Sequence, residues 1–177
     1  MLYLPGDVAS NTKRLADTSF YSDANLVRYY TMDDLNEKNG NTLTNSGCSA
    51  ITGKFAGAYS SGSSNSSNRM YNSANLGING GACTITAWIK LNSTHTVSDH
   101  PLAVSEYSSS TGVLNGIGFN QGNTAVQFSR LREAIAWQDA TYSYSPGTSD
   151  WHFYVYTFDG STIRGYVDGV LVTTAGG

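Results

Sequence analysis

The sequence predicts an all-β protein built as an antiparallel β-sandwich of the jelly-roll type. Two Asp-Gly pairs, Asp159-Gly160 and Asp168-Gly169, each follow a run of aromatic and β-branched residues, which is the strongest short-range signal for a β-hairpin. Residues 97–130 contain short strand-like runs separated by Gly and Asn turns, and a helical period is almost absent. Short strands at regular spacing are typical of sandwiches and jelly rolls.

The last part of the chain is predicted to form a three-stranded antiparallel meander. Its strands are expected at residues 151–158, 162–167 and 170–173, with the two Asp-Gly pairs as turns. Because strand side chains alternate, Tyr154, Tyr156 and Phe158 share one face of the first strand. Trp151, which opens that strand, is expected to be structural.

The earlier segments carry weaker signals. Residues 1–24 show no clean period and are predicted to be an N-terminal arm or leader, followed by one domain over residues 25–177. Within that domain, residues 25–34 and 83–90 alternate as strands would, whereas residues 60–81 are rich enough in Ser, Asn and Gly to predict an edge strand, a long loop, or both. Residues 129–140 have the only helix-like composition, yet residues 130–137 fit a strand and a turn equally well.

The composition excludes several classes of function. With 10 Lys and Arg against 13 Asp and Glu, the 177-residue chain has a net charge of -3 and no basic stripe, so we expect no nucleic acid partner. No apolar run approaches the roughly 20 residues of a membrane span, and the first residues lack the apolar segment of a secretory signal. Membrane insertion is therefore not expected.

The abundance of Gly, Tyr, Ser, Thr and Asn is nevertheless more typical of all-β surface proteins than of cytosolic enzymes. Two explanations stay open. The chain is a fragment of a longer protein, or it assembles inside a cell and is released by lysis, as virion proteins are.

The two cysteines, Cys48 and Cys83, match no zinc or redox spacing. Either they form a disulfide, which would stabilise the fold by about 3 to 4 kcal/mol in the chain-entropy model, or they are two unconnected small apolar side chains.

Four segments occur in the order and spacing of a known module. They are NLVRYYTMDDL, GKFAGAY, CTITAWIK and WHFYVYTFDGSTIRGYVDGVLV, which begin at Asn25, Gly53, Cys83 and Trp151. Over residues 25–172 the chain thus resembles laminin G-like modules with the concanavalin A-like jelly-roll fold. The resemblance implies a non-catalytic binding module, frequently for carbohydrate or protein surfaces, and many such modules hold one Ca²⁺ at an edge of the sandwich.

The chain departs from the family pattern in three places. The segment Tyr59–Gly62 lacks an Asp that could serve calcium, and Gly165 stands where the family prefers a larger aliphatic residue, so a gap or a neighbouring side chain is expected there. The sequence also stops at Thr173–Gly177, where the family continues with further strands. Because an open sheet edge exposes unpaired backbone groups, we expect the N-terminal arm, a neighbouring subunit or an omitted portion of polypeptide to complete the sheet.

One cluster of oxygen-bearing side chains is a candidate calcium site. Calcium takes six to eight oxygen ligands, and Asp33, Asp34, Asn36 and Asn39 offer such a group. The alternative is a solvated turn in which Asn and Asp serve the backbone, and the missing Asp near Gly62 favours it.

Sugar recognition needs flat aromatic faces beside hydrogen-bonding groups. The best candidates are Trp137, Tyr142 and Tyr144, with Gln138, Asp139 and Asn120 as polar companions. In the alternative interpretation Trp137 plugs the end of the sandwich and the tyrosines alternate along an exposed strand. Trp88, Arg164 and Tyr166 are expected to line the other sheet face and to pack against the leader.

No catalytic residue is expected. Glycosidases need two carboxyl groups about 5 to 9.5 Å apart, whereas Glu106 and Glu133 stand alone in the sequence. The three histidines, His95, His100 and His152, are scattered without metal spacing or an evident Ser or Cys partner.

The leading hypothesis is a non-catalytic β-sandwich module displayed on a virion, in particular that of a phage, or on a cell surface. It would bind a glycan or a surface protein or mediate adhesion, and would form a homo-oligomer or larger assembly. The alternatives are an accessory carbohydrate-binding module cut from a larger secreted multidomain protein and, less well supported, a glycan hydrolase.

Overall fold

A computed structural model of the chain describes residues 23–36, 42–62, 68–74, 78, 81–92, 94, 102–108, 112–132 and 136–176. It divides into two compact units. The first comprises residues 1–60 and 68–72, and the second comprises residues 61–67 and 73–177. The predicted arm over residues 1–24 lies almost wholly outside the described residues, and the boundary near residue 24 stays a prediction. Within the described ranges, no helix has the length and apolarity that crossing a bilayer requires.

The first unit contains two small antiparallel pairs of strands. Strand β1 (Thr44–Ser46) pairs with β4 (Arg69–Tyr71), and β2 (Ser49–Thr52) pairs with β3 (Gly57–Ser60). The prediction for residues 60–81 is confirmed in that β4 is a short strand within this Ser- and Asn-rich region.

Residues 25–34 do not form the strand that their alternation predicted. The segment instead opens with a turn, in which the Asp23 carboxylate accepts a hydrogen bond from the Asn25 N–H and the Asp23 carbonyl accepts one from the Leu26 N–H. Met32 then adopts a left-handed conformation with φ of 64°, which interrupts extended backbone. Local Asx-turn chemistry has overridden the apolar pattern here.

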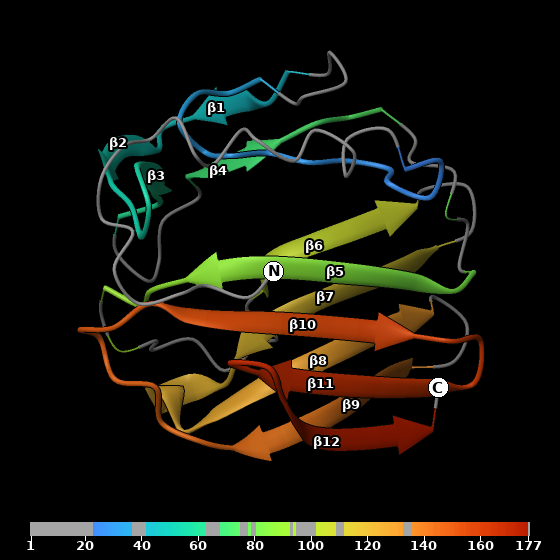
Figure 1. The fold of residues 1–177 in the computed structure, drawn as a ribbon. Coiled ribbons are helices and arrows are strands. Elements are labelled where there is room, and N and C mark those ends of the chain that lie inside the picture. The colour runs from blue at the N-terminus through green and yellow to red at the C-terminus, as the bar shows by residue number, and fades with distance from the viewer. Residues whose placement is uncertain are drawn as a thin grey trace. The chain divides into compact units, whose positions relative to one another are not determined.

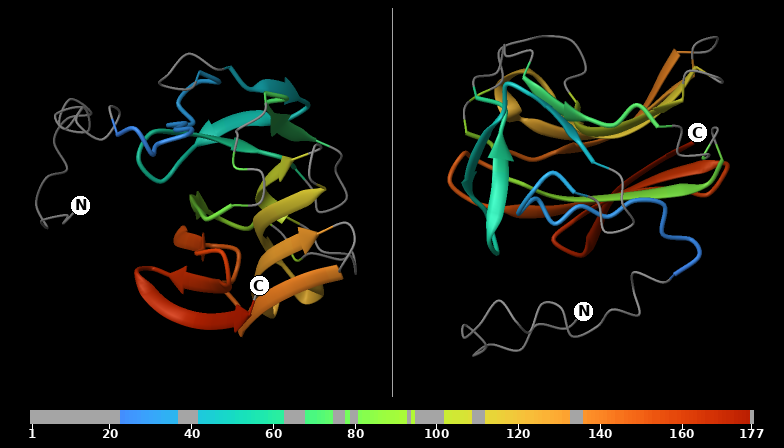
Figure 2. Two further views of the ribbon diagram at one scale, coloured as in Figure 1. Left: turned by 90° about the vertical axis from the view of Figure 1, so that its right-hand side faces the viewer. Right: turned by 90° about the horizontal axis from the view of Figure 1, so that it is seen from above.

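The second unit is a sandwich of two antiparallel four-stranded sheets (Figures 1 and 2). The front sheet has the order β12-β11-β10-β5, and the back sheet has the order β6-β7-β8-β9. The front strands are β5 (Cys83–Ile89), β10 (His152–Phe158), β11 (Thr162–Val167) and β12 (Val170–Gly176), and the back strands are β6 (Leu102–Ser108), β7 (Val113–Phe119), β8 (Ala125–Arg132) and β9 (Ala136–Ser143).

The predicted strands of this unit are confirmed. The meander is β10–β11–β12, and the two Asp-Gly pairs form its turns, with positive φ at Asp168, Gly160 and Gly169. Strand β5 alternates between half-buried and exposed side chains, as CTITAWIK predicted. Of the two alternatives for residues 130–137, the strand is correct for the described residues, because β8 runs to Arg132 and β9 starts at Ala136; residues 133–135 lie outside the described residues.

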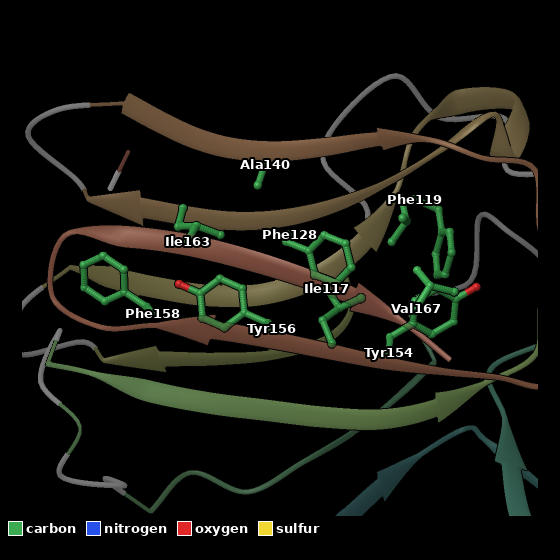
Figure 3. Packing of buried hydrophobic residues seen from close by; sticks show 10 residues of the cluster. Ile117, Phe119, Phe128, Ala140, Tyr154, Tyr156, Phe158, Ile163 and Val167 are labelled. Atoms are coloured by element: carbon green, nitrogen blue, oxygen red, sulfur yellow. The ribbon is translucent and has the colours of Figure 1, made fainter. Parts of the chain in front are cut away.

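The apolar core lies between the two sheets (Figure 3). Side chains at alternate positions of facing strands meet there, as the period of two requires. The largest fully buried apolar or aromatic side chains are Tyr154, Tyr156, Phe128, Ile117, Ile163 and Val126. The shared face of β10 predicted from sequence is thus an inner face.

Gly165 makes room for the ring of Phe128. A Cβ placed on Gly165 would lie 2.1 Å from Cδ2 of that ring, and Phe128 is fully buried. The sequence left open whether this position holds a gap or a neighbouring side chain. A neighbouring side chain fills it, because the Phe128 ring of the back sheet packs over Gly165 of the front sheet.

A row of polar side chains crosses the inner face of the back sheet. Glu106, Asn115 and Arg130 occupy directly paired positions on β6, β7 and β8. The Asn115 amide donates to the Glu106 carboxylate at 2.9 Å, and Arg130 donates to the Asn115 carbonyl at 2.8 Å. Tyr156 of the front sheet donates to the same carbonyl oxygen at 2.8 Å. The row therefore connects both sheets.

Candidate carbohydrate-binding surface

The outer face of the back sheet carries mostly polar side chains on β8 and β9, whereas its inner face combines core residues with the polar row of Glu106, Asn115 and Arg130. Since Val126, Phe128 and Ala140 point into the core, the alternate residues of β8 and β9 point outward. Gly116, Ser129 and Asp139 lie side by side in one row across three strands. The next row consists of Gly118, Gln127 and Thr141. We call the outward-pointing residues Gln127, Ser129, Trp137, Asp139 and Thr141 the polar face.

Ser129 has an unusual position on the polar face. Its side chain is only 1% exposed, and its hydroxyl oxygen is buried without a hydrogen-bond partner. Buried polar groups are almost always paired with protein or ordered water. The Ser129 hydroxyl can both donate and accept a hydrogen bond, but it has almost no accessible surface, so it underlies the polar face and is not a ligand contact.

Trp137 provides the aromatic component of the polar face. It is half-buried, lies two residues from Asp139 on the same side of β9, and pairs with Leu131 of β8. A neutral aromatic ring beside a carboxylate, a hydroxyl and an amide is the combination that sugar recognition needs.

Of the six residues predicted to bind sugar, the structure places Trp137 and Asp139 on the polar face. Trp137 and Asp139 share the outer face of β9, while Gln138 and Tyr142 lie on its inner side, where Tyr142 packs against the core. Sequence reasoning missed Ser129 and Gln127. The alternation in the segment AVQFSRL could have identified both residues, because Gln127 and Ser129 alternate there with the core residues Val126 and Phe128.

Asn120 serves the turn that leads from β7 into the 3₁₀ turn η3 (Gln121–Asn123) and on to β8. Its side-chain carbonyl accepts a hydrogen bond from the Ala125 N–H at 2.6 Å, and its amide donates to the Thr124 hydroxyl at 2.9 Å. Asn120 is thus a turn-capping residue, separate from the polar face.

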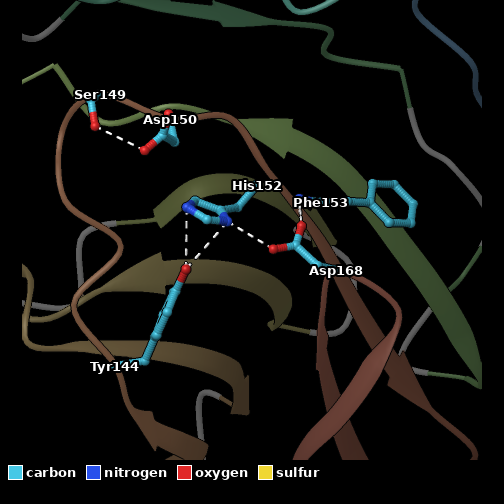
Figure 4. Close-up of polar contacts among 6 residues, drawn as sticks. All are labelled: Tyr144, Ser149, Asp150, His152, Phe153 and Asp168. Atoms are coloured by element: carbon cyan, nitrogen blue, oxygen red, sulfur yellow. Dashed lines mark hydrogen bonds and ion pairs between the residues drawn. The ribbon is translucent and has the colours of Figure 1, made fainter. Parts of the chain in front are cut away.

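Tyr144 belongs to a second cluster, at the loop before β10 and the turn after β11 (Figure 4). His152 lies 2.8 Å from the Asp168 carboxylate, and the Tyr144 hydroxyl lies 3.2 Å from both ring nitrogens of His152. The second Asp168 oxygen accepts a hydrogen bond from the Phe153 N–H at 2.9 Å. The ring of Tyr144 also stacks on Tyr142.

The hydrogen bonds among Tyr144, His152 and Asp168 connect three segments of the second unit. Burial, with the carboxylates of Asp168 and Asp150 as further causes, raises the pKa of the Tyr144 phenol. Tyr144 therefore stays a neutral hydrogen-bond donor rather than a nucleophilic phenolate. The cluster joins the start of β10 to the β11–β12 turn and to the residue that follows β9.

The residues proposed for calcium serve the backbone where the structure describes them. The Asp33 carboxylate accepts a hydrogen bond from the Gly57 N–H, and the Asp34 carboxylate accepts one from the Asn36 N–H, both at 2.8 Å. Asn36 accepts from the Thr42 hydroxyl at 3.2 Å, and Asn39 lies outside the described residues. Among the described residues, no group of three His, Cys, Asp or Glu is placed to hold a metal. Calcium binding stays a prediction.

Both cysteines are free thiols, Cys48 in the first unit and Cys83 in the second. This corresponds to the alternative in which the two cysteines are unconnected apolar side chains. Burial and the Glu106 carboxylate raise the pKa of the Cys83 thiol to about 11, against a lowering influence of Arg130, and burial also raises the pKa of Cys48. Neither thiol is activated as a nucleophile.

The acidic residues considered for hydrolysis do not share a described surface. Glu106 is 7% exposed and points between the sheets. Glu133 lies outside the described residues, as do His95 and His100.

Two stacked antiparallel sheets with a polar and aromatic outer face define a β-sandwich protein of the jelly-roll class. The chain belongs to the concanavalin A-like lectin/glucanases superfamily, whose laminin G-type family model matches residues 61–177. Modules of this kind often bind carbohydrate or mediate adhesion. Comparisons with curated proteins and with solved structures gave no match.

Proposed function

We propose that this protein is a non-catalytic carbohydrate-binding module that holds its glycan on the polar face of the back sheet. The observation that carries the proposal is the placement of Trp137 and Asp139 on one side of β9, beside the accessible side chains of Gln127 and Thr141. The aromatic ring offers an apolar contact for the C–H face of a sugar, and the polar groups offer partners for its hydroxyls. The superfamily, which contains lectins and glucanases, supports a sugar ligand.

The arrangement of carboxylates favours binding over hydrolysis. Glycoside hydrolysis needs two carboxyl groups about 5 to 9.5 Å apart across the substrate. On the described part of the outer face of the back sheet, Asp139 supplies one carboxylate, and Glu106 of the same sheet points inward.

Display on a virion or cell surface, and assembly into an oligomer or larger particle, belong to the same proposal. They are supported by the low content of charged residues and the abundance of Gly, Tyr, Ser, Thr and Asn. A module within a longer secreted protein would use the polar face in the same way.

A glycan array followed by titration of intrinsic Trp fluorescence tests the proposal. Trp137→Ala is expected to weaken binding about tenfold or more, the equivalent of about 1.4 kcal/mol, because truncating a central aromatic contact typically costs more than about 1 kcal/mol.

Trp88→Ala is the matched control, since Trp88 is a partly exposed Trp on the outer face of the front sheet. It should leave affinity unchanged. A silent array, an unaffected Trp137→Ala variant, or turnover of the bound glycan would contradict the proposal.

A further inference from the structure

The edges of the two sheets of the second unit differ in how they are protected. The edge strands are β12 and β5 in the front sheet and β6 and β9 in the back sheet. An edge strand presents backbone N–H and C=O groups to any extended chain that can pair with it, and native proteins usually protect such edges with bulges, charged side chains or a covering segment.

Strands β12 and β9 contact each other at one side of the sandwich. The Thr173 hydroxyl of β12 donates a hydrogen bond to the backbone carbonyl of Thr141 in β9 at 3.1 Å, and a bulge interrupts the pairing of β12 with β11. Strand β6 has a register irregularity near its start and carries the inward-pointing charge of Glu106. Each of these features hinders pairing with another chain.

Strand β5 is regular and uncharged. All seven of its residues pair with β10 without a register shift, and they include no charged residue, Pro or Gly. In an antiparallel pair, alternate residues bond to the neighbouring strand, and the residues between them direct their N–H and C=O groups to the other side. Within the described part of the chain, β10 is the one strand that pairs with β5. The geometry of the outward groups is that which accepts a further strand.

The side-chain pattern of β5 fits an antiparallel copy of itself. Thr84, Thr86 and Trp88 are exposed on its outer face, whereas the residues between them are half-buried on its inner face. An antiparallel pair centred on Thr86 places Trp88 of each copy opposite Thr84 of the other, and Ile85 opposite Ala87. Aromatic and β-branched residues in such directly opposed positions stabilise a sheet.

The same pairing brings no like charges of this strand together. Lys90 follows β5, and a pair centred on Thr86 places it opposite Ala82 of the other copy, so the two lysines lie at opposite ends of the interface. The net charge of -3 adds little general repulsion between copies. Closed two-fold pairs are also the commonest oligomers of identical chains.

We infer that two copies of this protein associate through antiparallel pairing of their β5 strands, which joins the two front sheets into one continuous sheet. This inference rests on the proposed function, because it names the surface through which the proposed homo-oligomer forms. The two-fold axis of an antiparallel strand pair is perpendicular to the sheet. Both polar faces therefore lie on one side of the dimer, where they can engage one multivalent glycan surface.

Sedimentation velocity of the whole protein over a range of concentrations tests the association. The wild type is expected to form a dimer. Thr86→Lys and Thr86→Glu are each expected to weaken dimerisation about tenfold or more, equivalent to about 1.4 kcal/mol, because like charges directly opposite each other in a sheet are destabilising. An equimolar mixture of the two variants should regain the association, since Lys and Glu are then opposite each other.

Ser143→Lys is the matched control. Ser143 is an exposed residue at the end of the edge strand β9, so the variant adds the same charge at another sheet edge and should dimerise like the wild type. Hydrogen exchange of the wild type provides a second measurement if the Thr86 variants fail to fold. At high protein concentration, alternate β5 amides should exchange more slowly than at low concentration.

The outcomes separate this inference from the proposed function. If the wild type dimerises and neither Thr86 variant weakens the dimer, the β5 interface is wrong while assembly stands. If the wild type is a monomer at every concentration, the assembly itself is wrong. Protection of the β5 amides that is equal at all concentrations would show that another segment of the same chain covers this edge, which also overturns the inference. Glycan binding is judged by the array in every case.

Discussion

At the scale of one residue, Gly165 is part of the core packing because its lack of a side chain leaves room for the Phe128 ring. A Cβ on this residue would meet the ring of Phe128 at 2.1 Å, and that ring is fully buried and cannot swing into solvent. Gly165→Ala is therefore expected to lower the free energy of unfolding by about 1 to 3 kcal/mol, the usual cost of overpacking a core. Urea denaturation followed by Trp fluorescence measures it.

Gly176→Ala is the control for this substitution. Gly176 lies at the end of the neighbouring strand β12, and nothing lies within 4 Å of a Cβ placed there. The control should unfold at the wild-type urea concentration. Equal destabilisation of the two variants, or none in Gly165→Ala, would show that Phe128 can move aside.

Individual residues were only partly predictable from sequence. Gly165 was recognisable as a departure from the family pattern, but the identity of its neighbour depended on how two sheets face each other. Trp137 and Asp139 were chosen as sugar-binding candidates on their chemistry alone, and their place on one face of β9 follows from the strand period. Ser129 was missed because a serine in a strand is common, and only the burial of its hydroxyl makes it informative.

At the scale of an element, the β10–β11 hairpin depends on one carboxylate. Asp159 accepts hydrogen bonds from the backbone N–H groups of Ser161 and Thr162 and from the guanidinium of Arg164. The hydrogen bond from Arg164, followed by those from the backbone, holds the pKa of Asp159 well below its usual range.

A pH dependence of stability follows from this shift. Because the pKa is lower in the folded state than the unfolded value of about 3.9, the contribution of Asp159 is fully present above about pH 4 and is lost as the pH falls further. Thermal unfolding between pH 6 and pH 2.5 should show a smaller acid-induced loss of stability in Asp159→Asn than in the wild type.

Arg164→Gln provides the graded comparison for this experiment. It removes the largest cause of the pKa shift but leaves the backbone hydrogen bonds to Asp159 in place. Its pH profile should lie between those of the wild type and Asp159→Asn. Superimposed profiles for all three proteins would show that the exposed turn contributes nothing measurable.

Elements were more predictable than residues, and the reason is local chemistry. Asp-Gly turns and strict alternation specify β5 and the meander without reference to the rest of the chain. Residues 25–34 failed because alternation alone does not make a strand, and the Asp23 turn and the left-handed Met32 interrupt it.

At the scale of the whole molecule, the two-sheet architecture could be predicted, but the division into two units could not. Sequence periodicity shows which faces are apolar and does not show which strands share a core. The same limit applies to Glu106 and Arg130, which are distant in sequence and were not recognised as members of one row. Only the register of β6, β7 and β8 places them on either side of Asn115.

Asn115 is the residue on which this row depends, since it contacts Glu106, Arg130 and Tyr156 and is fully buried. Asn115→Ala would remove hydrogen-bond partners from two buried charged side chains at once. Breaking buried polar contacts of this kind typically costs about 3 to 5 kcal/mol, so the variant should unfold at much lower urea concentration. Tyr156→Phe removes one hydroxyl and leaves the charged partners of Asn115 in place, and should cost only about 1 kcal/mol. If Asn115→Ala cost no more than Tyr156→Phe, the two sheets would be held in register by apolar contacts alone, and the polar row would have no structural role.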